Sequence, residues 1–220
     1  MELKRIAEEM QPRTMAARDW VFQVIRTAIV RGVLQDGMPL RQDEISAALS
    51  VSHIPVREAF RQLEAQGLVR IYPNRGAVVT KLTKQEMANI MDTRIILELG
   101  AIRAAFPYIT DEILNEAAAL IDLSEGETDL HKIEDLNLQF HFLLYSPANN
   151  KTMFDLIETL HANVDRYIRQ FYITDDGAAN REHRALIDAC RNKDIVLADA
   201  VLRTHLERCK RLLMNLPNVD

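Results

Sequence analysis

Up to about residue 82, apolar positions with helical spacing are interrupted by turn residues, and the segment ends in two short β-rich runs. Val21, Ile25 and Ile29 recur at the 3.6-residue period of a helix. A Pro/Asn/Gly stretch between the β-rich runs is typical of a hairpin turn. We therefore expect three helices and a hairpin in residues 14–82, after an N-terminal arm, residues 1–13, without clear periodicity. The expected helices are 14–31, 42–49 and 52–66, and the expected strands are 68–72 and 77–80.

Beyond residue 82 the spacing of apolar residues stays helical to the end of the chain. Thr83 and Glu86 have the spacing of a capping box, which marks the start of a helix. Pro107 and Pro147 mark breaks between later helices. The pattern predicts a mainly α chain whose second segment, residues 83–220, contains about six helices. The expected helices are 83–106, 110–123, 129–145, 151–172, 178–192 and 194–216.

Composition and charge narrow the class of protein. Hydrophobic residues make up 48% of the chain and charged residues 27%, which excludes a fibrous or disordered protein. There are two cysteines, too few for a disulfide framework, and no apolar run approaches the roughly 20 residues of a membrane span. We therefore expect a cytoplasmic protein that does not enter a membrane.

The net charge of −5 hides a difference between the two segments. Residues 1–82 hold 12 basic and 9 acidic side chains, whereas the remainder holds 15 basic and 23 acidic side chains. A basic segment joined to an acidic one is typical of a chain whose first part meets an anionic partner.

The three helices and hairpin have the order of a winged helix-turn-helix, in which the third helix presents its first residues to the DNA major groove. We expect Ser52 to cap the third helix, and with the first helical amides it also suits a phosphate oxygen. His53 could touch a base edge. Arg57 and Arg61 share one helix face, and Arg57 suits phosphate or guanine. The alternative is that these arginines are solvated surface charges. The hairpin tip, suited to a minor groove or to the backbone, contains Asn74, Arg75 and Gly76.

Residues 40–69 resemble the DNA-binding domain of the GntR family of bacterial transcription factors. The resemblance implies sequence-specific operator binding as a homodimer. Arg57 matches a family position that contacts DNA, and Arg41 lies near enough to help. His53 and Asp43 stand where arginine is found in the family, which implies a different operator, weaker phosphate attraction, or both. The matching motifs are Val51-Ser52-x-x-Pro55-Val56-Arg57-Glu58-Ala59, Leu63-Glu64-Ala65-x-Gly67-Leu68-Val69 and Asn74-Arg75-Gly76.

Three histidines lie on three different expected helices of the second segment: His141, His183 and His205. Neutral imidazole nitrogens bind Zn²⁺ and similar ions, so three that converge could hold a metal. The alternative is three separate structural histidines, because the gaps in the sequence are too long to show convergence. Asn137 precedes His141 by one helical turn, so this pair could supply two ligands to one ion.

The second segment resembles the FCD ligand-binding domain of FadR/VanR-type members of the same family. This resemblance implies an antiparallel helical bundle with a central cavity. It also implies a divalent ion, such as Zn, Ni or Mn, held by an Asp and three His and completed by a small carboxylate effector. Asn137 stands in place of the Asp, so a metal-free polar pocket is the alternative. Arg94 could hold the effector carboxylate or pair with Glu98. The matching residues are Arg94-x-x-x-Glu98, 137–144, 149–150, 182–189 and 205–206.

These observations predict a ligand-responsive DNA-binding transcriptional regulator, with repression relieved by ligand the commoner outcome in the family, and not an enzyme. A metal-dependent hydrolase would need a general base near a metal-bound water. Glu182 is the candidate, but it adjoins His183, and adjacent helix positions point about 100° apart. An architectural nucleic-acid protein would leave the histidine set without a purpose. We expect only surface or structural roles for His131 and His161.

Overall fold

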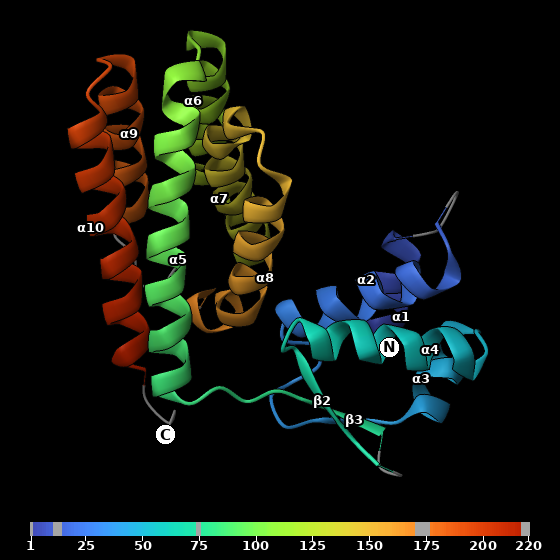
Figure 1. The fold of residues 1–220 in the computed structure, drawn as a ribbon. Coiled ribbons are helices and arrows are strands. Elements are labelled where there is room, and N and C mark those ends of the chain that lie inside the picture. Colours follow the sequence, from blue (N-terminus) through green and yellow to red (C-terminus); the bar gives the residue numbers. More distant parts are fainter. Residues whose placement is uncertain (1, 11–14, 74–75, 170–176, 217–220) are drawn as a thin grey trace. The chain divides into compact units, whose positions relative to one another are not determined.

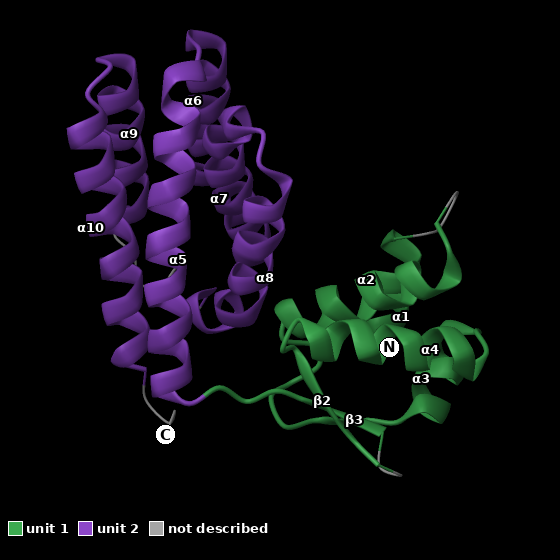
Figure 2. Cartoon of the chain, viewed as in Figure 1, with its two compact units in different colours: residues 1–82 green, residues 83–220 purple. Residues whose placement is uncertain are grey.

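The structure, a computed structural model, describes residues 2–10, 15–73, 76–169 and 177–216. The chain divides into two compact units, residues 1–82 and 83–220 (Figure 2). The described residues are mainly helical, with a small sheet in unit 1, which confirms the predicted fold class. None of the helices in these ranges is long and apolar enough to cross a membrane.

Unit 1 is built around two helices that pack directly against each other, α2 and α4. Val21 and Ile25 of α2 and Phe60 and Leu63 of α4 are buried in its core. Helices α3 and α4 are joined by a tight turn in which Ser50 has a left-handed backbone, with φ of 56°. This is the helix-turn-helix that the sequence predicts. The bounds of these three helices are α2 (Ala17–Val30), α3 (Gln42–Leu49) and α4 (His53–Ala65).

The expectation of an irregular N-terminal arm is wrong for most of that segment, because Glu2–Glu9 forms helix α1. Ile6 is fully buried, α1 contacts α2 and α3, and the Arg31 guanidinium donates to Glu9 at 2.9 Å. An isolated helix of this length is marginal in water, so tertiary packing stabilises it. Residues 11–13 of the expected arm lie outside the described residues.

The predicted hairpin is present as β2 (Val69–Tyr72) and β3 (Gly76–Val79), which pair antiparallel with Val69 opposite Val79. A third strand, β1 (Pro39–Leu40), pairs with the other side of β3, so the strand order is β1-β3-β2. The sequence did not predict β1, because two residues are too few to show an alternating pattern. Asn74 and Arg75, at the expected tip, lie outside the described residues.

Gly76 is required where β3 starts, and its replacement by Ala should destabilise unit 1. Its φ is +80°, and a Cβ atom there would lie 2.5 Å from the backbone oxygen of Leu40. Gly37 also has a positive φ, +74°, but a Cβ there would meet nothing within 4 Å. We expect Gly37→Ala to cost about 1–3 kcal/mol for the strained backbone alone and Gly76→Ala to cost clearly more. Urea denaturation measures both, and equal losses would show that the contact with β1 is unimportant.

Unit 2 is an antiparallel helical bundle in which α5 contacts α7, α8 and α10 (Figure 1). The predicted capping box is present: Thr83 accepts from the Glu86 amide, and the Glu86 carboxylate accepts from the Thr83 amide. Helix α8 ends at Ile168, before the predicted end, and residues 170–172 lie outside the described residues. Two single-turn 3₁₀ helices, Phe106–Tyr108 and Ser146–Ala148, follow α5 and α7. The helices are α5 (Lys84–Ala105), α6 (Asp111–Glu125), α7 (Leu130–Tyr145), α8 (Lys151–Ile168), α9 (Ala178–Arg191) and α10 (Ile195–Met214).

Candidate functional site

Unit 1 carries a surface groove of about 900 Å³ that is lined by residues of α3, α4 and the sheet. The groove brings together four of the residues singled out in the sequence: Arg41, Arg57, Arg61 and Gly76. The groove also includes Tyr72, a partly exposed aromatic side chain on β2 that the sequence analysis did not single out. The arrangement places a helix face and a strand edge around one basic surface.

Ser52 and His53 lie at the start of α4 and are exposed, outside the residues that line the groove. Ser52 occupies the N-cap position with an extended backbone, but its side chain makes no capping hydrogen bond. This corrects the expectation that the Ser52 side chain caps the helix. The first amides of α4 and this hydroxyl are therefore placed to meet an anion, which is the favourable charge at a helix N-terminus.

Acidic residues temper the positive charge of this surface. His53 Nε2 lies 3.5 Å from an Asp43 oxygen, and Arg41 Nη1 lies 3.5 Å from a Glu44 oxygen. Neither Arg57 nor Arg61 forms an ion pair with another residue in the described part of the chain. Such exposed pairs contribute little to stability, about 0–1 kcal/mol. Because Glu44 and Asp43 lie beside Arg41 and His53, the positive charge of this surface is concentrated on Arg57 and Arg61.

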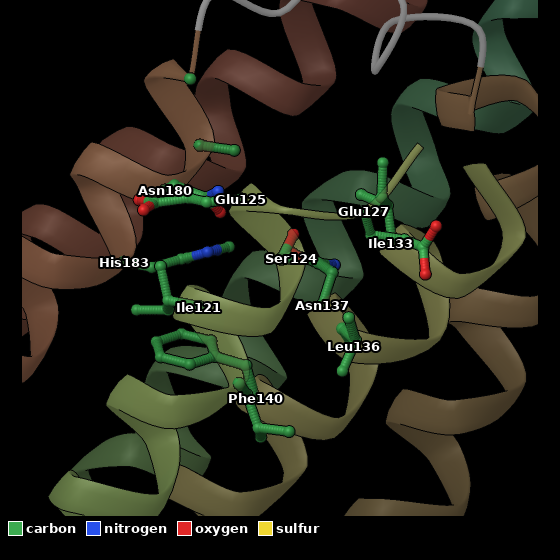
Figure 3. A pocket seen from close by; sticks show the side chains of 13 residues that line it. Ile121, Ser124, Glu125, Glu127, Ile133, Leu136, Asn137, Phe140, Asn180 and His183 are labelled. Atoms are coloured by element: carbon green, nitrogen blue, oxygen red, sulfur yellow. The ribbon is translucent and has the colours of Figure 1, made fainter. Parts of the chain in front are cut away.

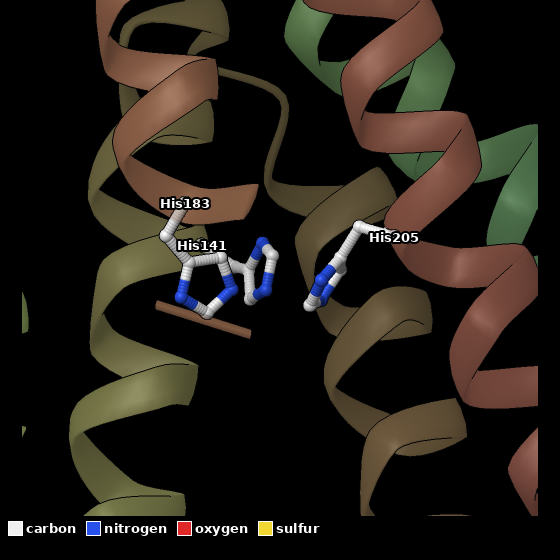
Figure 4. A group of neighbouring side chains, drawn as sticks. All are labelled: His141, His183 and His205. Atoms are coloured by element: carbon white, nitrogen blue, oxygen red, sulfur yellow. The ribbon is translucent and has the colours of Figure 1, made fainter. Parts of the chain in front are cut away.

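In unit 2, three histidines from three helices come together (Figure 4). His141 of α7, His183 of α9 and His205 of α10 each offer one ring nitrogen, and these nitrogens lie within 4.8 Å of one another. All three side chains are buried, with 1–5% of their surface exposed. Sequence spacing could not establish this convergence, because it depends on how α7, α9 and α10 pack.

Hydrogen bonds orient two of these rings. The Tyr145 hydroxyl donates to Glu98 at 2.9 Å, so the His141 Nδ1–H donates to the Tyr145 oxygen, 3.2 Å away. The other nitrogen of His141 is then left with a lone pair for a ligand. His205 Nδ1 lies 2.7 Å from a Glu182 oxygen. Such outer hydrogen bonds fix the orientation and basicity of metal-binding histidines.

The third ring has an unusual feature, because Nε2 of His183 is buried and has no hydrogen-bond partner among the described residues. A buried polar atom without a partner costs free energy, typically about 1–3 kcal/mol. A metal ion in the centre of the triad would satisfy this atom.

Protonation of the three rings differs with their surroundings. Burial, together with the nearby charge of His205, lowers the pKa of His141 and of His183 well below the ordinary value. Burial also acts to lower the pKa of His205, but Cys209 and Glu182 outweigh it and raise that pKa to about 9. The pKa of Cys209 is lowered, because the charge of His205 outweighs the effect of burial. Metal binding must therefore displace a proton from His205.

Arg94 is buried in an ionic network that reaches His141 of the triad through Glu98 and Tyr145. Its Nε donates to Glu98 at 2.9 Å, Nη2 lies 2.7 Å from His161 Nε2, and Nη1 lies 3.5 Å from Asp165. The ion pair with Glu98 is therefore formed, and Arg94 also lines a small cavity. His161 is buried within this network, so it does not lie on the surface.

Two cavities meet near the triad. The smaller, about 40 Å³, is lined by His141 and His205 and also by Arg94, Arg208 and Cys209. The larger, about 270 Å³, has polar and apolar walls and reaches His183 and Phe140 (Figure 3). Asn137 and Ala179 line both. Asn137 thus lies beside the triad, where a ligand could touch it from either cavity.

The carboxylate of Glu182 is already engaged, because Arg208 Nε donates to it at 2.8 Å while His205 holds its other oxygen. This leaves it poorly placed to act as a general base on a metal-bound water. The sequence analysis missed Arg208 and Cys209 as site residues. Their positions, three and four residues after His205 on one helix, were the available signal.

Comparisons with known proteins agree for both units. Residues 17–79 match the gntR family of bacterial regulatory proteins, and residues 89–208 match the FCD domain. The HTH-type transcriptional repressor RspR of Escherichia coli (strain K12) is 28% identical over 88% of this chain and 87% of its own length. A probable D-xylose utilization operon transcriptional repressor of Paenarthrobacter nicotinovorans is 30% identical over 81% and 80%. The crystal structure of a putative transcriptional regulator GntR from Rhodococcus sp. RHA1 superimposes with a TM-score of 0.75 and 26% identity, covering 91% of this chain and 99% of that one.

Proposed function

Because this chain belongs to the GntR family of bacterial regulatory proteins and carries an FCD domain, we propose a specific role for it as a DNA-binding transcriptional regulator. It is a cytoplasmic, ligand-responsive repressor that binds a pseudo-palindromic operator as a homodimer. The groove of unit 1, with two arginines held by no ion pair in the described residues, is the observation that carries the DNA-binding part. The family and its relatives are transcriptional regulators and not enzymes.

Two kinds of DNA contact follow from this surface. Arg57 and Arg61 of α4 enter the major groove, where arginine binds guanine or phosphate. Ser52 and the first amides of α4 bind a backbone phosphate, and His53 lies beside the base edges. Arg41 and the hairpin formed by β2 and β3 contact the flanking backbone. Asn74 and Arg75, which the sequence predicts at the hairpin tip, lie outside the described residues and stay candidates for the same contact. A homodimer would place two such helices one helical turn of DNA apart.

Unit 2 holds a divalent ion through His141, His183 and His205, with Asn137 beside them. The residues fit such an ion: the buried Nε2 of His183 needs a partner, and Glu182 and Tyr145 orient the other two rings. A bound ion would supply positive charge and an open coordination position. The donor set is typical of Zn²⁺ or Ni²⁺, and less so of Mn²⁺, which favours oxygen ligands.

The effector is a small organic acid. Arg94 and Arg208 line the cavity beside the triad, and guanidinium groups bind carboxylates through paired hydrogen bonds. Both arginines already face carboxylates, Arg94 through Glu98 and Arg208 through Glu182. An effector carboxylate therefore competes with the protein's own carboxylates, so its binding can change the packing of α5 and α10.

Helix α5 offers a route from this pocket to unit 1, because it carries Arg94 and begins at Lys84, directly after the boundary between the units. An effector can shift the regulator only by binding one arrangement of α5 more tightly than another. An electrophoretic shift of the promoter DNA beside the protein's own gene tests the proposal. A shifted band that small dicarboxylates release supports it, and the absence of a shift with and without metal contradicts it.

Removing one histidine should weaken the metal site strongly. We expect His183→Ala to lower the affinity for Zn²⁺ by more than about 100-fold, because the loss of a mere outer hydrogen bond already costs roughly 10–100-fold. The variant should also lose any thermal shift caused by effector. His131→Ala, on the same helix as His141 but outside the triad, is the control. Metal analysis of the purified proteins decides it, and equal metal content in both variants would remove His183 from the site.

A further inference from the structure

Cys209 lies beside the histidine triad on the same helix as His205. The two residues are one helical turn apart on α10, and Cys209 Sγ lies 4.0 Å from His205 Nε2. Both side chains line the small cavity, together with His141. A pair of ligands four residues apart on a helix can bind one ion from the same face.

The spacing of these atoms suits a shared ion. In a tetrahedral zinc site with Zn–N of about 2.1 Å and Zn–S of about 2.3 Å, the sulfur and nitrogen atoms are about 3.6 Å apart. The observed 4.0 Å exceeds this by a few tenths of an ångström. The sulfur does not yet belong to the set of ligand atoms that lie within 4.8 Å of one another, so the Cys209 side chain must turn toward the three histidines when the ion binds. A second, independent observation points to a ligand at the triad to which His205 belongs: Nε2 of His183 is buried and has no partner within the described residues, and the residue is 4% exposed.

We propose that Cys209 binds the metal as a thiolate and makes the centre a site of three histidines and one cysteine. The inference rests on the metal site proposed above and specifies its donors. Asn137 offers only a neutral oxygen, so a thiolate supplies the negative charge that the set otherwise lacks. On binding, the Cys209 S–H proton and the displaced ring proton of His205 both pass to solvent, and the sulfur and the ring nitrogen each form a bond to the ion, with no change of oxidation state. A soft thiolate selects Zn²⁺ over Mn²⁺.

The other cysteine is a matched control. Cys190 is buried in the hydrophobic core of unit 2, among residues such as Leu186 and Leu202, and does not line either cavity. Cys190→Ala should therefore leave the metal site unchanged, whereas Cys209→Ser removes the sulfur and keeps a small polar side chain.

Titration of the full-length, metal-stripped protein with Co²⁺ tests the inference. Cobalt bound by histidines in a tetrahedral site absorbs in the visible, and a cobalt–thiolate bond adds a charge-transfer band in the near ultraviolet. We expect both bands in the native protein and in Cys190→Ala, and only the visible bands in Cys209→Ser.

The result that overturns the inference is a native protein with visible bands and no near-ultraviolet band, which needs no variant to interpret. A near-ultraviolet band that persists in Cys209→Ser also overturns it. Absence of all cobalt bands in the native protein overturns the metal site itself, and the inference with it. The failure of the two proposals is thus distinguishable in one titration.

Discussion

Arg57→Ala is expected to weaken operator binding by about 10- to 100-fold while leaving the fold and the proposed homodimer intact. The side chain is exposed on α4 and lines the groove, so its loss removes the proposed DNA contact without opening the core. An arginine contact to a base is worth about 1–3 kcal/mol, which corresponds to this range. Fluorescence anisotropy with a labelled operator at fixed salt measures the change.

Two further variants sharpen this prediction. Arg18→Ala removes the same charge from unit 1 at an exposed position on α2, outside the groove, and should change affinity little. Arg57→Lys separates the two kinds of contact, because lysine keeps a phosphate contact but cannot make the paired hydrogen bonds of arginine to guanine. Unchanged affinity in Arg57→Ala, with the fold intact, would remove Arg57 from the set of DNA contacts.

Glu98→Gln is expected to destabilise unit 2 by about 3–5 kcal/mol, the usual cost of breaking a buried ion pair. Glu98 is fully buried and accepts from Arg94 at 2.9 Å and from the Tyr145 hydroxyl at 2.9 Å. Gln has the same shape without the charge, so the carboxylate that Arg94 would keep among the described residues is Asp165, at 3.5 Å. Urea denaturation followed by circular dichroism measures the free energy of unfolding.

An exposed ion pair is the control for this prediction. Asp155 pairs with Lys151 on the surface of α8, where both side chains are more than half exposed. Asp155→Asn should cost about 0–1 kcal/mol. If the two variants lose the same stability, the network around Glu98 does not stabilise the bundle.

The Glu98 carboxylate also sets the direction in which the stability of unit 2 changes with pH. Burial acts to raise the pKa of Glu98, but Arg94 and His161 outweigh it and hold the pKa well below 4.5. A carboxyl group whose pKa is lower in the folded state than in the unfolded state contributes its full stabilisation of the fold at pH values above the unfolded pKa. We therefore expect this contribution to be present at neutral pH and lost as the pH falls below about 4.5. Glu98→Gln should flatten the profile in that acidic range.

Local patterns predicted the elements well, and the failures have a common physical cause. The helix at 42–49 and the capping box of Thr83 depend on nearest neighbours, so sequence reasoning could find them. Strand β1, with two residues, is too short to show a period. Helix α1 is as long as α3 but buries only Ile6 and Ala7, and it is held by its contacts with α2 and α3. They could not be predicted from the residues they contain.

The same distinction between local pattern and tertiary packing holds for the candidate site. The sequence placed the three histidines on three expected helices, and the resemblance to the FCD domain implied that they share one ion. Only the packing of α7, α9 and α10 brings them together. Two alternatives were open for Arg94, an ion pair with Glu98 and a position beside a pocket. The structure shows both, because Arg94 donates to Glu98 and also lines the small cavity. His161 was assigned no specific role, because no pattern in the sequence indicates that it faces Arg94, 67 residues away.

Competition binding to genomic DNA tests the central claim most directly, that unit 1 reads a specific operator under the control of unit 2. The purified full-length protein is mixed at moderate salt with fragments of its own genome and an excess of random duplex, with and without metal and small carboxylates. The account predicts enrichment of a few fragments that share two half-sites about 10 base pairs apart, and their release by an organic acid. Equal retention of all fragments under every condition would contradict it.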